Sequence, residues 1–138
     1  MSAVVRTMTV SKHAHFVLRL GLAFVFGWFG VDKFLNVQAW YGWIPSWLTF
    51  VPQNPFLYVL GVVEVIVALF LLLNKYVRFA SITCAAFLVG VVLSFGINEI
   101  TVRDIGLIAM ALALALMPVQ KKYHELREIE RFVRRQKK

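Results

Sequence analysis

The chain has 138 residues, of which 60% are hydrophobic and 16% are charged. This composition is too apolar for an ordinary soluble domain of the same length and is typical of a membrane protein. The net charge is +8, but most basic residues lie where they would contact anionic lipid headgroups, so the charge does not indicate nucleic-acid binding. The single cysteine, Cys84, excludes an intramolecular disulfide or thiol redox pair.

Four apolar stretches are long enough to cross a hydrocarbon core of about 30 Å, which needs about 20 residues of helix. Little sequence remains for a second domain, so we expect residues 1–138 to form one all-α integral membrane four-helix bundle. The segment 120–138 is predicted to be a basic amphipathic tail that lies on the cytoplasmic leaflet or docks on a partner. The predicted spans are residues 16–35, 56–73, 77–97 and 100–119.

The distribution of the basic residues predicts the orientation of the spans. All of the 15 Lys and Arg residues except Lys33 and Arg103 lie near the N-terminus, at the turn between the second and third spans, or in the C-terminal tail. Short cytoplasmic loops collect Lys and Arg, so both termini are predicted to be cytoplasmic, as an even number of spans requires. No small-residue cleavage site follows the first span, which we therefore expect to be a retained anchor.

Small residues recur at helical spacing beside polar residues in the first three spans. In lipid, small side chains let neighbouring helices approach closely, so we expect these faces to lie inside the bundle. The three predicted faces consist of Arg19, Ala23, Gly27 and Gly30 in the first span, Gly61, Glu64 and Ala68 in the second, and Ala86, Gly90, Ser94 and Asn98 in the third.

Glu64 lies near the middle of the second span. An acidic residue at a helix centre costs about 2.5–3.5 kcal/mol on insertion, so it needs a compensating partner or a proton. Arg19 and Lys33 are the candidate partners, and we prefer Arg19 because its planar guanidinium binds a carboxylate through two hydrogen bonds. The resulting pair could fix the register of the helices, or it could form part of a functional pocket, which is the default for intramembrane charge.

The loop between the first two spans contains Trp40, Trp43 and Trp47. Their spacing of three and four residues would place them together on helical turns, although Pro45 should interrupt a regular helix. We favour an aromatic belt at the headgroup level of the outer face, where Trp and Tyr are enriched. The alternative is a lid over a lipid-soluble ligand.

A second polar group, the segment NEITVRD, lies between the third and fourth spans. We favour a solvated turn in which Asp104 stabilises a helix N-terminus. Alternatively, these residues face inward beneath the aromatic loop and form a polar pocket with Lys33, to which Asp32 would also belong. The polar residues of the segment are Asn98, Glu99, Arg103 and Asp104.

The sequence contains no catalytic motif of its own. His13 and His15 have no cysteine or carboxylate ligand beside them, so no metal site is expected. There is also no Gly-rich phosphate loop and no nucleophile elbow. Any redox chemistry would therefore have to come from a partner.

Several short motifs over the first 80 residues resemble the DoxX family of small four-helix membrane proteins. An arginine lies early in the first span, GVDKF ends that span, and RFA opens the third. The sequence departs from the family at Ala68 and Asn74, where glycines are expected. The positions that carry the resemblance are Arg19, Gly30, Lys33, Gly61, Glu64 and Arg78, with Arg103 and Asp104 at the start of the fourth span.

The resemblance implies a bacterial or archaeal cytoplasmic-membrane protein, whose relatives include the small subunits of thiosulfate:quinone oxidoreductase and a membrane component linked to oxidative-stress defence. It places Arg19, Lys33 and Glu64 at the polar positions of the family. We therefore predict a subunit or accessory component of a membrane oxidoreductase, with an intramembrane pocket for a quinone or another lipid-soluble ligand. A structural or assembly protein, associated with another membrane protein or a second copy, and a small proton-linked carrier are the alternatives.

Overall fold

The computed structural model describes residues 3–48, 50–117, 132, 133, 135 and 136, and this part of the chain contains helices and no strand. The helix bounds lie close to the predicted spans except at the start of α1, where residues 3–15 contain no Gly or Pro that would end a helix. The elements are α1 (Ala3–Leu35), η1 (Val37–Trp43), η2 (Ser46–Leu48), α2 (Gln53–Leu72), α3 (Val77–Phe95) and α4 (Glu99–Leu116), where η denotes a 3₁₀-helix.

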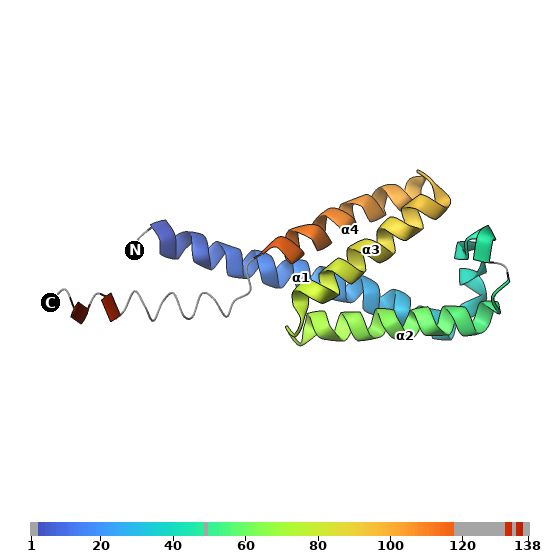
Figure 1. The fold of residues 1–138 in the computed structure, drawn as a ribbon, viewed down its shortest axis with the longest axis horizontal. Coiled ribbons are helices and arrows are strands. Elements are labelled where there is room, and N and C mark those ends of the chain that lie inside the picture. Colours follow the sequence, from blue (N-terminus) through green and yellow to red (C-terminus); the bar gives the residue numbers. More distant parts are fainter. Residues whose placement is uncertain (1–2, 49, 118–131, 134, 137–138) are drawn as a thin grey trace.

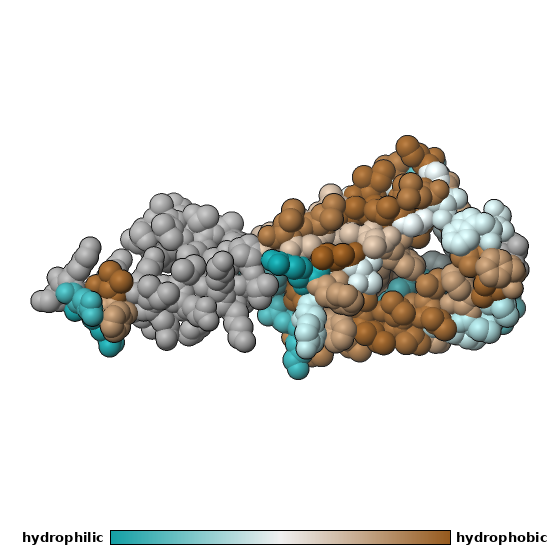
Figure 2. All heavy atoms as spheres, viewed as in Figure 1, coloured by the Kyte–Doolittle hydropathy of each residue, from teal (hydrophilic) through white to brown (hydrophobic). Residues whose placement is uncertain are grey.

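Three helical segments are long and apolar enough to cross a membrane, namely Lys12–Leu35, Gln53–Leu72 and Val77–Phe95. Apolar residues cover much of the outer surface of these helices, whereas paler, more polar residues gather at the end that carries η1 (Figure 2). α4 has charged residues in its first two turns, so the fourth span and the orientation of the termini stay predictions. The predicted tail helix at 120–138 lies outside the described residues except for 132, 133, 135 and 136.

The helices form two antiparallel hairpins, α1 with α2 and α3 with α4, and most contacts between helices lie within these two pairs (Figure 1). In the view of Figure 1 the hairpins are closest near the α2–α3 turn and diverge toward the end that carries η1. The core between them is built from aliphatic and aromatic side chains, with Cys84 fully buried among them. Its largest members are Leu22, Phe26, Leu71, Leu88 and Leu114.

Three residues in the turns have positive φ, and two of them are of a type that tolerates it. Asn74 has φ 56° and Tyr76 has φ 50° in the α2–α3 turn, and Gly96 has φ 68° after α3. Asparagine tolerates the left-handed region better than most residues, which explains how Asn74 replaces the glycine that the family resemblance led us to expect. Pro52 is the residue before α2, and its fixed φ suits this boundary.

The first two predicted small-residue faces are confirmed as internal. A Cβ atom added at Gly30 would lie 2.9 Å from the carbonyl oxygen of Gly61, and one added at Gly61 would lie 2.9 Å from that of Gly30. Gly27 lies against Ala68, at 3.6 Å from its Cβ to a Cβ placed on the glycine. α1 and α2 therefore cross with their backbones nearly in contact, which only glycine allows.

The third predicted face is wrong. Ala86, Gly90, Ser94 and Asn98 are exposed, and among the described residues no atom beyond the adjoining backbone of α3 lies within 4 Å of a Cβ placed on Gly90. Small and apolar residues occur on every side of this helix, so its composition does not select one face. The Ser94 hydroxyl donates to the carbonyl of Gly90 at 2.8 Å and needs no partner on another helix. The buried residues of α3 are instead Ala80, Ser81, Cys84, Ala85 and Leu88.

Candidate functional site

Glu64 forms an ion pair with Lys33, not with Arg19. The Nζ of Lys33 lies 2.7 Å from the Oε2 of Glu64, and both side chains are buried. Lys33 Nζ also lies 3.8 Å from the centre of the Trp40 ring, in cation–π geometry. Our preference for Arg19 is therefore wrong, while the expectation that an α1 cation compensates Glu64 is confirmed.

The crossing of α1 and α2 explains this choice of partner. Lys33 lies one turn beyond Gly30, and Glu64 lies one turn beyond Gly61, so each charge is at the same spacing from the contact point. Side chains on a helix lean toward its N-terminus. Because the two helices are antiparallel, the side chains lean toward each other across the crossing. A guanidinium could make two hydrogen bonds to the carboxylate, but the position of Lys33 along α1 decides which cation reaches Glu64.

The ion pair forms part of a cavity of about 260 Å³ at the end of the molecule that carries η1. All four α-helices and η1 contribute to its wall, so it lies between the two hairpins. Apolar side chains make up most of that wall. The lining residues are Phe29, Lys33, Trp40, Trp43, Leu57, Leu60, Glu64, Phe87, Leu88, Val91, Ile100, Arg103 and Asp104.

Two of the three loop tryptophans reach this cavity. Trp40 packs edge-on against Phe29, with ring centres 5.4 Å apart, and its indole N–H donates to Asp32 at 2.9 Å. Trp43 packs against Phe95 of α3 at 5.1 Å, so η1 bridges the hairpins. Trp47 is 67% exposed and does not line the cavity, and its place in an aromatic belt stays a prediction. The alternative of a lid applies to Trp40 and Trp43 alone.

Asp32 does not line the cavity but contacts a residue that does. Its carboxylate accepts from the side-chain amide of Asn36 at 2.7 Å as well as from Trp40. It therefore holds the Trp40 ring in place above Lys33. The sequence gives no signal for this contact, because residues eight apart at a helix end meet only where the chain turns back after the helix.

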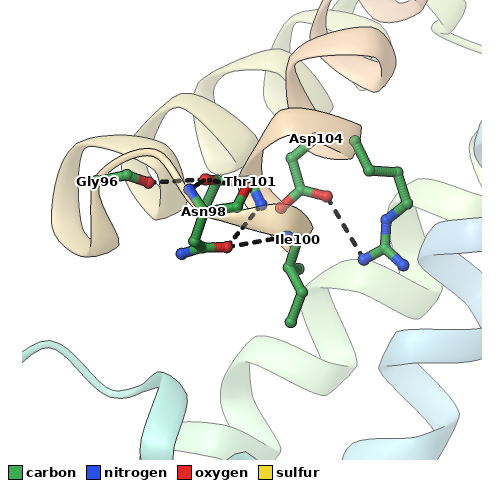
Figure 3. A network of polar contacts seen from close by, with 6 residues as sticks. Gly96, Asn98, Ile100, Thr101 and Asp104 are labelled. Atoms are coloured by element: carbon green, nitrogen blue, oxygen red, sulfur yellow. Dashed lines mark hydrogen bonds and ion pairs between the residues drawn. The ribbon is translucent and has the colours of Figure 1, made fainter.

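Of the four polar residues predicted around the start of α4, Arg103 and Asp104 line the cavity, whereas Asn98 and Glu99 do not. Asn98 caps the helix: its Oδ1 accepts from the backbone nitrogens of Ile100 and Thr101 at 2.9 and 3.0 Å, and Thr101 Oγ1 accepts from the Asn98 backbone (Figure 3). Asn98 and Glu99 are exposed and do not line the cavity, in agreement with a solvated turn.

Arg103 and Asp104, in contrast, line the cavity and contact each other. The Nη2 of Arg103 lies 3.7 Å from the Oδ1 of Asp104, whose carboxylate is buried and turned toward the guanidinium in Figure 3. The expectation that Asp104 stabilises the helix N-terminus is wrong, because Glu99 is the acidic residue of the first turn and Asp104 lies beyond it. Arg103 is 59% exposed in this pair and also lies over the Phe29 ring, at 5.9 Å.

Arg19 is remote from the cavity. It is buried on α1 nearer the start of the predicted span, and its guanidinium lies 5.8 Å from the ring of Phe16. Arg19 and Lys33 are separated by about 21 Å of helix at 1.5 Å per residue. The predicted site residues therefore divide into three sets: those that line the cavity, those that are exposed near it, and the remote cation Arg19. The exposed set is Trp47, Asn98 and Glu99.

The chemistry of the cavity follows from its lining. Two cations and two carboxylates balance in charge, so the cavity suits a neutral ligand better than an ion. Lys33 and Arg103 supply hydrogen-bond donors, the carboxylates supply acceptors, and the rest of the wall is apolar or aromatic. Among the described residues, no group of three or more His, Cys, Asp or Glu side chains is placed to hold a metal ion.

The apolar transmembrane helices and the buried ion pair define a helical membrane protein with a mainly apolar cavity that contains four charged side chains. Residues 14–97 match the DoxX family, which is more than half of the chain. The protein therefore belongs to the DoxX family, and the resemblance noted in the sequence is confirmed. No curated protein and no solved structure matches the chain.

Proposed function

We propose that this DoxX protein binds the headgroup of a quinone, or of another lipid-soluble ligand with polar oxygen atoms, as a subunit or accessory component of a membrane oxidoreductase. The observation that carries the proposal is the cavity in which Lys33–Glu64 and Arg103–Asp104 face an otherwise apolar wall. A quinone headgroup is a neutral ring whose carbonyl oxygens accept hydrogen bonds, and this lining offers donors beside aromatic surface.

The two ion pairs would have different roles toward such a ligand. Lys33 contacts Glu64 at 2.7 Å and the Trp40 ring, so its side chain is a fixed part of the cavity wall. Arg103 lies 3.7 Å from Asp104 and 5.9 Å from the centre of the Phe29 ring, and its side chain is 59% exposed. We infer that Arg103 is the donor free to turn toward a ligand oxygen, with Asp104 as the acceptor beside it.

The chain would not perform the redox reaction alone. It contains one cysteine, and that thiol is buried in the core. Electrons for a bound quinone would have to arrive from a partner subunit that carries its own cofactor. This requirement supports the role of a subunit or accessory component over that of an independent enzyme.

The proposal includes a four-span topology in the cytoplasmic membrane of a bacterium or archaeon, with residues 1–138 as one domain and both termini in the cytoplasm. Support comes from the basic residues Lys75 and Arg78, which are exposed at the α2–α3 turn, and from the basic tail 120–138. The cavity then lies near the outer surface. A ligand tail would leave it between the hairpins, toward the lipid.

The test is quinone binding by the purified full-length chain, measured by quenching of tryptophan fluorescence. Arg103→Gln is expected to weaken binding about tenfold, because it removes one charged hydrogen-bond donor. Glu99→Gln is the matched control, since Glu99 lies in the same turn region but outside the cavity, and it should bind as the wild type does. Equal binding by both variants, or no quinone binding by the wild type, would contradict the proposal.

A second candidate function, that of an assembly protein, is favoured by the exposed face of Ala86, Gly90 and Ser94 on α3. Small residues exposed to lipid allow close approach of another transmembrane helix. Gly90→Leu should then reduce recovery of a partner from native membranes, whereas Gly106→Leu on α4, where a Cβ also meets open space, should not. If both variants copurify with the same proteins as the wild type, this candidate fails.

A further inference from the structure

The two α1 residues His15 and Arg19 differ from every other buried polar group among the described residues. His15 is 7% exposed and Arg19 is 9% exposed. Within the described part of the chain, His15 Nδ1 and Arg19 Nε are the fully buried side-chain nitrogen or oxygen atoms that lack a hydrogen-bond partner. Buried polar groups are nearly always paired, so these two require an explanation.

The two side chains share one face of α1. They are four residues apart, which stacks them one turn above the other on the inner side of the helix. Both present nitrogen atoms, and a guanidinium supplies several N–H donors in a fixed plane. Arg19 Nε can only donate, so the partner that it lacks is an acceptor, and a negatively charged acceptor would also offset the charge of Arg19. His15 Nδ1 can donate to the same acceptor in the tautomer that carries its proton there.

The position of the pair indicates where that acceptor comes from. Arg19 lies about 10 Å along the helix from Lys12, where the candidate span begins. At this depth the side chain can extend toward the headgroup layer. Lys75 and Arg78 are exposed at the α2–α3 turn, which lies toward the same end of the helices in Figure 1, so this end attracts anionic lipid.

We propose that His15 and Arg19 form a binding site for a phosphate group, and that the headgroup of an anionic phospholipid supplies this phosphate. Arginine binds phosphate through paired hydrogen bonds, and the imidazole of His15 adds a further contact. Beside the pair, Phe16 is 50% exposed, with its ring centre 5.8 Å from the guanidinium, and Val17 and Leu20 are also exposed. These side chains provide an apolar surface for the acyl chains, which a free phosphate ion would not need.

The site is separate from the proposed quinone cavity and does not depend on it. About 21 Å of α1 lies between Arg19 and Lys33. A change at one end can therefore be measured without altering the ligand contacts at the other. Arg103→Gln, which tests the cavity, should leave phospholipid binding unchanged.

The experiment uses the delipidated full-length chain in detergent, with thermal unfolding and native mass spectrometry as readouts. Phosphatidylglycerol, phosphatidylcholine and inorganic phosphate are added separately. We expect phosphatidylglycerol to raise the melting temperature and to remain bound in the mass spectrum. Arg19→Gln should weaken this binding about tenfold, which corresponds to about 1.4 kcal/mol. Arg78→Gln, which removes an exposed cation, is the matched control and should retain the binding.

Three results would overturn the proposal. Equal stabilisation of the wild type by phosphatidylcholine and phosphatidylglycerol would remove the preference for anionic lipid. Equal loss in Arg19→Gln and Arg78→Gln would show diffuse attraction to a charged surface. Stabilisation by inorganic phosphate as large as by phosphatidylglycerol would show that the site takes a soluble ion. If Arg19→Gln does not fold, the lipid preference of the wild type and the binding of His15→Ala give the same test.

Discussion

Lys33 and Arg19 are both buried cations on the inner side of α1, yet their surroundings differ. Lys33 has a carboxylate at 2.7 Å and an aromatic ring at 3.8 Å. Arg19 has the ring of Phe16 at 5.8 Å, and its Nε has no hydrogen-bond partner in the described part of the chain. One end of the helix therefore neutralises its charge within the chain, and the other end leaves a cation available to a group from outside the chain.

This difference teaches that burial alone does not identify a functional cation. A buried pair such as Lys33–Glu64 can fix helix register and still shape a cavity, whereas a buried cation without a partner points to a missing ligand. Removal of the cation at one end of α1 should therefore change the stability by a different amount from removal of the cation at the other end. The following four are ordered by the size of the expected loss in stability.

Lys33→Met should have the largest effect. It leaves Glu64 buried without a partner, which costs about 3–5 kcal/mol in comparable sites. Unfolding by sodium dodecyl sulfate in mixed micelles would measure the loss. The double variant Lys33→Met with Glu64→Leu should recover much of it, because no uncompensated charge remains. A double variant as unstable as the single one would mean that packing, and not charge, decides the effect.

Gly61→Ala should destabilise the protein by about 1–3 kcal/mol, the usual cost of overpacking. The added Cβ would lie 2.9 Å from the backbone carbonyl of Gly30 and 3.3 Å from the Cβ of Lys33, so the crossing that aligns the ion pair must open. Gly90→Ala is the control, because its Cβ meets no neighbour. The same unfolding assay applies, and equal stability of the two variants would show that the crossing tolerates separation.

Asn98→Ala should cost about 1 kcal/mol, because the cap of α4 loses its side-chain acceptor. The change would also loosen the turn that positions Arg103 and Asp104 at the cavity. Ser94→Ala, whose hydroxyl bonds only within its own helix, should stay within about 0.5 kcal/mol of the wild type. Hydrogen exchange of the first turn of α4 would detect the loss, and unchanged protection there would contradict it.

Arg19→Met should have the smallest effect in delipidated detergent, within about 0.5 kcal/mol of the wild type or slightly stabilising. No carboxylate is left unpaired, because none contacts Arg19 among the described residues. This outcome contrasts with Lys33→Met on the same helix. A loss as large as that of Lys33→Met would show that Arg19 is compensated within the protein after all.

The sequence predicted features that depend on spacing within a helix. The inward faces of α1 and α2 followed from small residues at intervals of three and four, and the structure confirms them. It also indicated that an α1 cation would compensate Glu64. The wrong choice of Arg19 arose because chemical preference says nothing about helix register, which the contact of Gly30 with Gly61 decides.

Features that depend on contacts between helices were harder to predict. α3 has small or apolar residues on all sides, so the sequence could not show that Ala80, Ser81 and Cys84 form its buried face. Likewise, the position of Trp40 above Lys33 depends on the path of the chain after α1. Local sequence does not encode that path, because it results from the packing of η1 across both hairpins.

The location of the Lys33–Glu64 pair within one hairpin has a consequence for biogenesis. Both charges belong to the first half of the chain, and their contact needs only α1 and α2. The pair can therefore form once α1 and α2 have inserted, without waiting for α3 and α4 to pack against them. The charges of Lys33 and Glu64 would then already be paired in the α1–α2 hairpin, and α3 and α4 could pack against this preformed hairpin.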